Sequence, residues 1–177
     1  MTSTTLKSLA REAKQRLIVG VGGLAVSNSR NAILTTYSLG SCLGITIYDP
    51  VVRAGGLLHA MLPNSNINRE KAMERPGMFV DTGVPALFRA AYELGVETQR
   101  VQICVAGGAQ FMDKTAFFNI GQRNYRCFVD LIREHGLSTR AEAVGGLVSR
   151  TVQLHLETGE VRLKTSGQTR ETILFGG

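Results

Sequence analysis

Residues 34–63 read LTTYSLGSCLGITIYDPVVRAGGLLHAMLP and contain the clearest strand pattern in the chain. Between residues 43 and 48, leucine or isoleucine alternates with glycine, threonine and tyrosine, which is the period-two pattern of a half-buried β-strand. Asp49–Pro50 is typical of the first two positions of a type I turn. A glycine pair then opens the apolar run LLHAMLP, so the segment predicts two antiparallel strands joined by a turn.

Cys42 and His59 are the residues of this segment whose side chains suggest catalysis. A turn centred between Pro50 and Val51 predicts that they lie directly opposite each other, on one face of the pair and roughly 5 Å apart at Cβ. A register shifted by two residues would make them diagonal neighbours, whereas a shift of one residue would place them on opposite faces. Whether they can react together therefore depends on the register.

A cysteine beside a histidine is a nucleophile beside a base. A free thiol is only a few per cent thiolate at neutral pH; a neighbouring histidine raises that fraction by ion pairing and can then protonate a leaving amine. A third polar group usually orients the imidazole, and the hydroxyls of Thr35, Thr36 and Ser38 lie just upstream of the cysteine. Spacing alone also fits two core residues, because a lone cysteine in an apolar context is usually a small buried side chain.

The whole chain has the composition of a globular protein, with 177 residues of which 44% are hydrophobic and 19% charged. We predict a single domain over residues 16–177, preceded by a polar extension over residues 1–15. The three cysteines show no C-x-x-C spacing, so we expect free thiols and a cytoplasmic location. The basic start and the apolar run after it resemble a signal peptide, but Glu12 and three glycines interrupt that pattern.

Several ligand and partner classes are not expected. No apolar run approaches the roughly 18 residues of a membrane span, so we predict no membrane insertion. The histidines and cysteines form no metal-ligand spacing, and we predict neither a metal nor a cofactor. The net charge of +6 favours an acidic partner. Because no basic cluster is interleaved with aromatic residues and tryptophan is absent, that partner is not expected to be nucleic acid.

The remaining periodicity predicts an α+β fold, with a largely antiparallel or mixed sheet and about two main helices over one side. Further strands are expected at 16–27, 32–39 and 100–108, with a hairpin around the ETGE stretch at 157–160. Helices are expected at 84–94 and 121–136, each followed or ended by glycine. The proline-bounded segment 63–77 is interpreted as a surface loop, and GGAQ at 107–110 as a tight turn, with an anion cradle as the alternative.

Several separated motifs resemble those of one known family. TYSLGSC at 36–42 is followed by YDP, HAMLP, PGMFVDTGVPALF, VAGGAQFM and NIGQRN, in that order. Together they resemble the chemoreceptor glutamine deamidase family, CheD, over roughly residues 17–164. The resemblance implies a cysteine hydrolase that converts chosen glutamines of methyl-accepting chemotaxis receptors to glutamate. It also implies the layered α/β/β fold shared with the cytotoxic necrotizing factor toxins, and CheC as a partner.

The resemblance also assigns roles to residues. It implies that Cys42 is the nucleophile, His59 the general base and Thr36 the residue that orients His59. The backbone at Gly40 and Ser41 is expected to form the pocket and the oxyanion site.

Two residues of the motif depart from the family pattern. The family commonly reads TLGLGSC, and this chain has Tyr37 in place of the leucine and Ser38 in place of the first glycine of that motif. We expect Ser38 to narrow the pocket or to compete with Thr36 for His59.

Basic residues outside the motif core are candidates for docking the substrate. Arg69, Lys71 and Arg75 lie in the 63–77 segment and are suited to an acidic receptor coiled coil. Arg123 and Asn124, at a predicted helix start, either brace the site or contact the receptor. Two other functions remain open: a non-catalytic or weakly catalytic adaptor that binds receptors or CheC, and a related thiol hydrolase or transglutaminase with another amide substrate.

Overall fold

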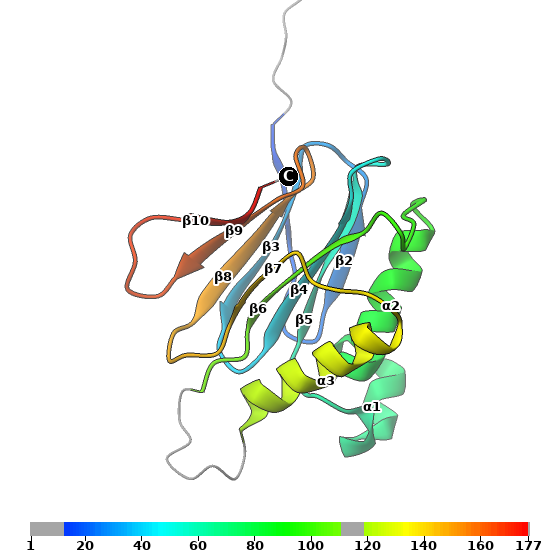
Figure 1. Cartoon of the computed structure of the whole chain (residues 1–177), viewed down its shortest axis with the longest axis vertical. Helices are drawn as coiled ribbons and strands as arrows, with labels where there is room; N and C mark the ends of the chain where they lie inside the picture. The colour runs from blue at the N-terminus through cyan, green and yellow to red at the C-terminus, as the bar shows by residue number, and fades with distance from the viewer. Residues whose placement is uncertain (1–12, 111–118, 177) are drawn as a thin grey trace, which may run out of the picture.

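The computed structural model describes residues 13–110 and 119–176, which form two stacked five-stranded sheets with helices on one side (Figure 1). The outer sheet contains, in spatial order, β1 (Gln15–Ile18), β3 (Ala32–Leu39), β8 (Arg150–His155), β9 (Glu160–Thr165) and β10 (Thr172–Phe175). The middle sheet contains β2 (Leu24–Ser27), β5 (Ala54–Ala60), β4 (Leu43–Asp49), β6 (Gln102–Gly107) and β7 (Ala141–Val144). The helices are α1 (Arg69–Glu74), α2 (Val80–Tyr92) and α3 (Ile120–Glu134), with 3₁₀ turns at Ser65–Ile67 and Pro76–Met78.

Alternating side chains of the middle sheet build two separate cores. Ile45 and Leu58 pack with α2 and α3, whereas Leu57 and Tyr48 pack against Leu34 and other residues of the outer sheet. Every residue of β4 is buried, so the prediction of a half-buried strand was wrong: the outer sheet covers the second face. The predicted α+β class and the layered α/β/β arrangement are confirmed.

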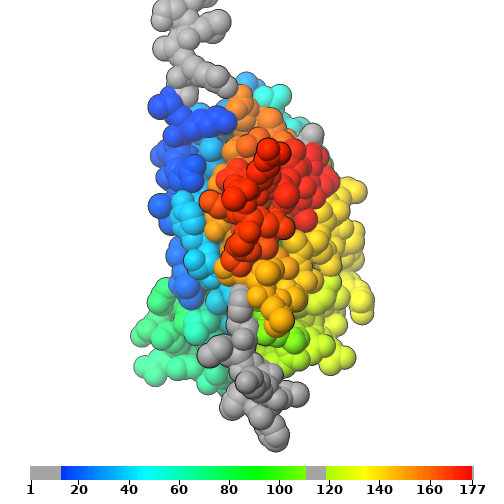
Figure 2. Space-filling view, turned by 90° about the vertical axis from the view of Figure 1, so that its left-hand side faces the viewer, coloured from blue at the N-terminus to red at the C-terminus, as the bar shows by residue number. Residues whose placement is uncertain are grey.

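The strand pairing is mixed, as predicted, since β1 pairs with β3 and β6 with β7 in parallel and the other pairs are antiparallel. The outer sheet ends in the β9–β10 hairpin, which lies across one face of the molecule (Figure 2). The helices α2 and α3 cover the opposite side of the middle sheet (Figure 1). Among the helices of the described residues, none is long and apolar enough to cross a membrane.

Three local predictions differ from the structure. The strand expected over 16–27 is split, because the chain leaves the outer sheet after β1, turns at Gly22 with φ of +70°, and enters the middle sheet as β2. The 63–77 segment is not a plain loop, since the Asn68 side chain accepts a hydrogen bond from Lys71 N and so caps α1. Helix α2 begins at Val80, four residues before its predicted start. Residues 1–12 of the predicted polar extension lie outside the described residues.

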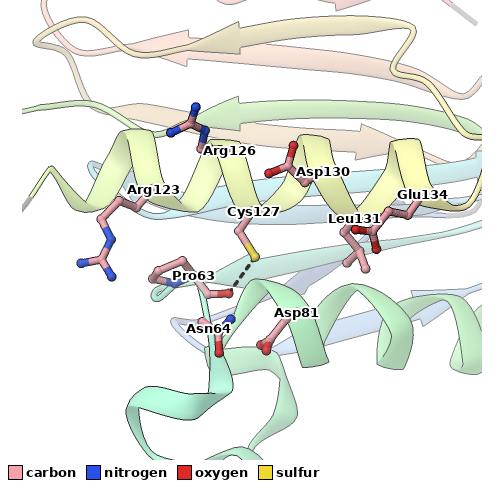
Figure 3. Close-up of a pocket in the computed structure, with 9 residues that line it drawn as sticks. All are labelled: Pro63, Asn64, Asp81, Arg123, Arg126, Cys127, Asp130, Leu131 and Glu134. Atoms are coloured by element: carbon pink, nitrogen blue, oxygen red, sulfur yellow. Dashed lines mark hydrogen bonds between the residues drawn. The ribbon is translucent and has the colours of Figure 1, made fainter.

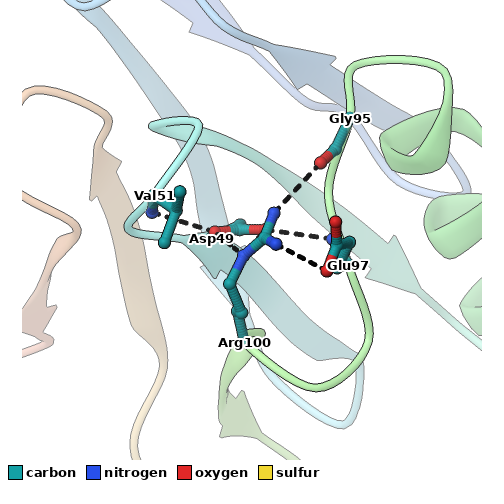
Figure 4. Close-up of polar contacts among 5 residues, drawn as sticks. All are labelled: Asp49, Val51, Gly95, Glu97 and Arg100. Atoms are coloured by element: carbon teal, nitrogen blue, oxygen red, sulfur yellow. Dashed lines mark hydrogen bonds and ion pairs between the residues drawn. The ribbon is translucent and has the colours of Figure 1, made fainter.

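The β4–β5 hairpin sets the register on which the site depends. Gly44 pairs with His59 and Asp49 with Ala54, so the connecting loop has four residues and the register is shifted by two from direct opposition of 42 and 59. Asp49, fully buried, accepts hydrogen bonds from Val51 N, Glu97 N and the Arg100 guanidinium (Figure 4). Burial alone would raise the pKa of Asp49, but these hydrogen bonds outweigh it and lower the pKa. The hairpin end is therefore anchored to the segment before β6.

Candidate active site

The three residues expected to be catalytic lie in or next to β3, β4 and β5, which belong to two facing sheets. Cys42 directly precedes β4, His59 lies in β5, and Thr36 lies in β3 of the outer sheet. Because Gly44 pairs with His59, residue 42 lies diagonally across from His59, and Cys42 packs against the core between the sheets. A Cβ at Gly44 would lie 2.6 Å from Leu39 Cδ1 and 3.4 Å from Thr36 Cγ2, so this glycine lets β3 approach the site.

Hydrogen bonds fix the orientation and the protonation of His59. Thr36 Oγ1 lies 2.7 Å from His59 Nδ1 and donates to Val19 O at 2.7 Å. Since the hydroxyl has one proton and Val19 receives it, His59 Nδ1–H must donate to Thr36. His59 Nε2 therefore carries the lone pair of the neutral ring, and it is buried without a hydrogen-bond partner among the described residues. Nε2 of His59 is therefore available to accept a proton.

The electrostatics favour a neutral pair at rest. His59 is 2% exposed, and its burial lowers its pKa from the ordinary value of 6.5. Burial raises the pKa of the Cys42 thiol, and its own backbone N–H offsets only part of that increase. The directions of both shifts disfavour the thiolate–imidazolium ion pair that the sequence led us to expect. The proton is instead available for transfer to His59 when the sulfur attacks.

The carbonyl groups of residues 40–42 are all held from one side. Gly40 O accepts from Ala109 N at 2.8 Å, Ser41 O from the Asn124 side chain at 2.9 Å, and Cys42 O from Gly108 N at 2.9 Å. In a trans peptide the N–H points opposite to the C=O. The N–H groups of Ser41 and Cys42 therefore point away from these partners, as an oxyanion site at the predicted position requires.

The glycine pair of the GGAQ stretch serves the turn that the sequence favoured. Gly107 has φ of +110°, and a Cβ there would collide with Cys42 O. Gly108, with φ of +62°, supplies the amide that binds this same carbonyl. Only glycine gives both the backbone conformation and the space, so the turn sets the position of the nucleophile.

Ser38 lies outside the hydrogen-bonded site. The pairing of β3 with β8 is irregular between Thr36 and Leu39, and Ser38 is exposed there with φ of 56°. Its backbone occupies the left-handed region that favours glycine, the residue that the family motif has at this position. The Nδ1 of His59 is bound by Thr36, not by Ser38.

The basic residues expected to dock the substrate divide into two groups. Arg69, Lys71, Arg75 and Arg123 are exposed, and Arg123 lines a groove of about 540 Å³ between α3 and the chain at Pro63–Asn64 (Figure 3). Asn124, in contrast, is fully buried, and it donates to Met61 O as well as to Ser41 O. Of the two roles left open for Asn124, its burial fits bracing of the site and not contact with a partner.

The two other cysteines have different surroundings. Cys104 is buried in β6, and burial raises its pKa to about 11. Cys127 donates to Pro63 O at 3.1 Å across the groove (Figure 3), and burial, followed by the charge of Asp81, raises its pKa to about 11. Cys42, in contrast, directly precedes β4 and lies diagonally across the strand pair from His59, so it is the cysteine whose position suits nucleophilic attack.

Sequence reasoning missed the backbone groups of the site. Val19 O receives the Thr36 proton, and the amides of Gly108 and Ala109 hold the nucleophile segment. The glycines around Val19 and in GGAQ were the available signal, because glycine marks a close approach of backbones.

Comparisons with known proteins identify the family to which the chain belongs. The family model described as "CheD chemotactic sensory transduction" matches residues 61–165. "Probable chemoreceptor glutamine deamidase CheD 1" of Syntrophus aciditrophicus is 45% identical over 151 residues, which cover 85% of this chain and 94% of the relative. The similarly named proteins of Solibacter usitatus and Pyrococcus horikoshii are 41% and 39% identical over 159 residues each, covering 90% and 88% of this chain and 94% and 96% of the relatives.

The extent of these alignments matters for the site. The family model begins at residue 61, after Cys42 and His59. The alignment with the Syntrophus protein covers 85% of the chain, so it necessarily includes the segment that contains both residues. The similarity thus extends over both sheets and the helices. This chain belongs to the CheD family.

Proposed function

We propose that this protein is a chemoreceptor glutamine deamidase, which hydrolyses the side-chain amide of receptor glutamines to glutamate and ammonia. The relatives carry this activity in their names. The observation that supports it best is the His59 side chain: Thr36 holds Nδ1, Nε2 has no hydrogen-bond partner among the described residues, and Cys42 lies diagonally across the strand pair. A nucleophile, an oriented base and unobstructed backbone amides are what acyl transfer from an amide needs.

In the first step Cys42 Sγ attacks the carboxamide carbon of the glutamine. His59 Nε2 takes the thiol proton as the C–S bond forms, because both groups are neutral at rest. The carbonyl oxygen becomes an oxyanion, which the N–H groups of Ser41 and Cys42 stabilise. Thr36 Oγ1 accepts a hydrogen bond from Nδ1–H throughout, so the imidazolium that forms is held in one orientation.

The intermediate then collapses in two stages. The C–N bond breaks as His59 gives its Nε2 proton to the departing nitrogen, which leaves as ammonia, and a thioester with Cys42 remains. His59 next removes a proton from water, the hydroxide adds to the thioester carbon, and the C–S bond breaks as His59 returns this proton to the Cys42 sulfur. The products are glutamate and the regenerated Cys42 thiol. A thiol nucleophile must stay reduced, which supports a cytoplasmic site of action in this proposal.

Receptor docking is part of the same proposal. Arg69, Lys71 and Arg75 are exposed on and next to α1, and Arg123 faces the adjacent groove. These cations suit an acidic receptor surface. Replacing Arg69, Lys71 and Arg75 by glutamine should weaken binding of a receptor fragment and reduce its dependence on salt, and unchanged binding would contradict docking there. Family membership also supports CheC as a partner, which a binding assay with purified CheC would test.

Ammonia release from a purified receptor fragment tests the activity. The wild-type protein should release ammonia, and Cys42→Ala should release none while it keeps the wild-type unfolding temperature. Cys127→Ala is the matched control, because it removes a half-buried thiol outside the site. Receptor binding without ammonia release by the wild type would instead support a non-catalytic adaptor.

A further inference from the structure

The side chain of Asn124 joins the segment of the nucleophile to the segment of the base. Asn124 lies in the second turn of α3 and is fully buried. Its Nδ2 donates to Ser41 O and to Met61 O, each at 2.9 Å. Ser41 immediately precedes Cys42, and Met61 follows His59 by two residues. Both protons of one NH₂ group are therefore used on the two chain segments that carry the reacting groups.

The hydrogen bond from Asn124 to Ser41 O controls the direction of the Cys42 N–H group. Ser41 C=O and Cys42 N–H belong to the same planar peptide unit and point in opposite directions. Holding the carbonyl toward α3 therefore holds Cys42 N–H toward the opposite side, where the oxyanion is expected to form. The second bond, to Met61 O, prevents rotation of the Asn124 amide, because rotation would break it.

An asparagine side chain is suited to donating two hydrogen bonds to two carbonyl groups. Asn124 Oδ1 is buried and accepts no hydrogen bond from the described residues. A flipped amide would place this oxygen against two carbonyl oxygens, so the acceptors themselves assign the orientation. The Asn124 carboxamide therefore contributes its two N–H donors to these contacts, and its oxygen makes no hydrogen bond to the described residues.

The helix that carries Asn124 is locked against the same loop. A Cβ at Gly121 would lie 2.6 Å from Ala109 O and would collide with Gly108 O. Gly108 N and Ala109 N are the donors that hold Cys42 O and Gly40 O. Close packing of α3 on this turn leaves little freedom for the Asn124 backbone. The side chain therefore donates to Ser41 O from a fixed backbone position.

We propose that Asn124 is a positioning residue for the reaction: it orients Cys42 N–H toward the oxyanion and does not touch the substrate. The inference rests on the proposed deamidase function. A misdirected oxyanion donor weakens binding of the transition state more than binding of the substrate, and loss of one such donor costs on the order of 10²–10³ in kcat. The effect should therefore appear in kcat and not in KM.

The test compares two reactions of Cys42 in the variants Asn124→Ala and Asn124→Asp. Deamidation passes through an oxyanion, whereas alkylation by iodoacetamide displaces iodide at a saturated carbon and forms none. We expect Asn124→Ala to lower kcat by roughly 10–100-fold, with KM and the alkylation rate each within about threefold of wild type. Asn124→Asp keeps the shape, and its buried neutral carboxyl donates one hydrogen bond, so an intermediate loss of kcat is expected.

The control is Cys127→Ala, which removes the hydrogen bond that the next turn of the same helix makes to Pro63 O. It should leave kcat within about twofold of wild type, because it does not touch residues 40–42. Unchanged kcat in both Asn124 variants would overturn the inference, as would alkylation that falls as far as kcat. If the wild type itself releases no ammonia, the proposed function fails and the inference falls with it.

Discussion

The hydroxyl of Thr36 lies 2.7 Å from Nδ1 of His59 and donates its only proton to Val19 O. This pair joins the two sheets at the site, since Thr36 belongs to β3 and His59 to β5. It also decides which ring nitrogen is the base, because Nδ1 must carry the proton. The role that the resemblance implied for Thr36 thus has a direct geometric counterpart.

Replacing Thr36 by valine tests this relationship. Valine keeps the shape but removes the acceptor, so the buried Nδ1–H loses its partner and the ring loses its preferred tautomer. We expect kcat for ammonia release to fall by roughly 10–100-fold. Thr36→Ser is the matched control and should keep most of the activity, because it retains the hydroxyl. A valine variant as active as the serine variant would contradict the proposed role.

The pH dependence of the Cys42 reaction tests whether His59 acts as a neutral base with a lowered pKa. His59 accepts a proton only when Nε2 is free, so the rate falls as pH drops through the His59 pKa. Burial lowers that pKa from its ordinary value of 6.5. We therefore expect the acidic midpoint of kcat/KM to lie below 6.5. A midpoint above 6.5 would contradict the lowered pKa of His59 and its role as a neutral base.

The turn after β6 predicts a strong effect of a single methyl group. Gly107→Ala places a Cβ against Cys42 O at a backbone φ of +110°. The nucleophile segment must then move, and Cys42 O loses the amide of Gly108. We expect ammonia release to fall at least about tenfold and the protein to lose about 2 kcal/mol or more of stability. Gly136→Ala also places a side chain at a positive φ, +68°, but in open space, so it measures the effect of a positive φ without a collision.

Asp49, a buried carboxylate outside the candidate active site, is expected to affect stability and not activity. Asp49→Asn removes the charge that pairs with Arg100 and keeps the shape of the side chain. We expect the midpoint of thermal unfolding to fall by about 5–10 °C, because Asp49 is fully buried and the Arg100 guanidinium loses one of its two carboxylate partners and keeps only Glu97. At a temperature where the variant is folded, kcat should stay within about twofold of wild type. An unchanged unfolding midpoint would show that the anchor contributes no stability.

Much of the site could be predicted from residues close together in the sequence. Alternation placed Cys42 and His59 on one face, and the observed shift of two residues preserved that face. The exact register could not be predicted, because the four-residue loop begins after Asp49, whose partner Arg100 lies 51 residues away. The resemblance identified Thr36, but Val19 acts through its carbonyl, which no side-chain pattern marks.

The errors in the fold have a common physical origin. Both faces of β4 are buried because a second sheet, formed by strands distant in the sequence, covers one of them. The local alternation of residues therefore wrongly predicted that one face is exposed. The crossing between β1 and β2 depends on which sheet each strand joins. Short edge strands such as β7 and β10 carry little pattern of their own and are stabilised by pairing with neighbours.

Mass spectrometry of a chemoreceptor fragment in ¹⁸O-labelled water tests the central claim most directly. The wild-type protein should convert specific glutamines to glutamate and place one ¹⁸O atom in each new carboxylate, because water resolves the Cys42 thioester. Cys42→Ala should leave every glutamine intact, while Cys127→Ala should behave as wild type. Glutamate formed at wild-type rate by Cys42→Ala, or no conversion by the wild type, would contradict the account.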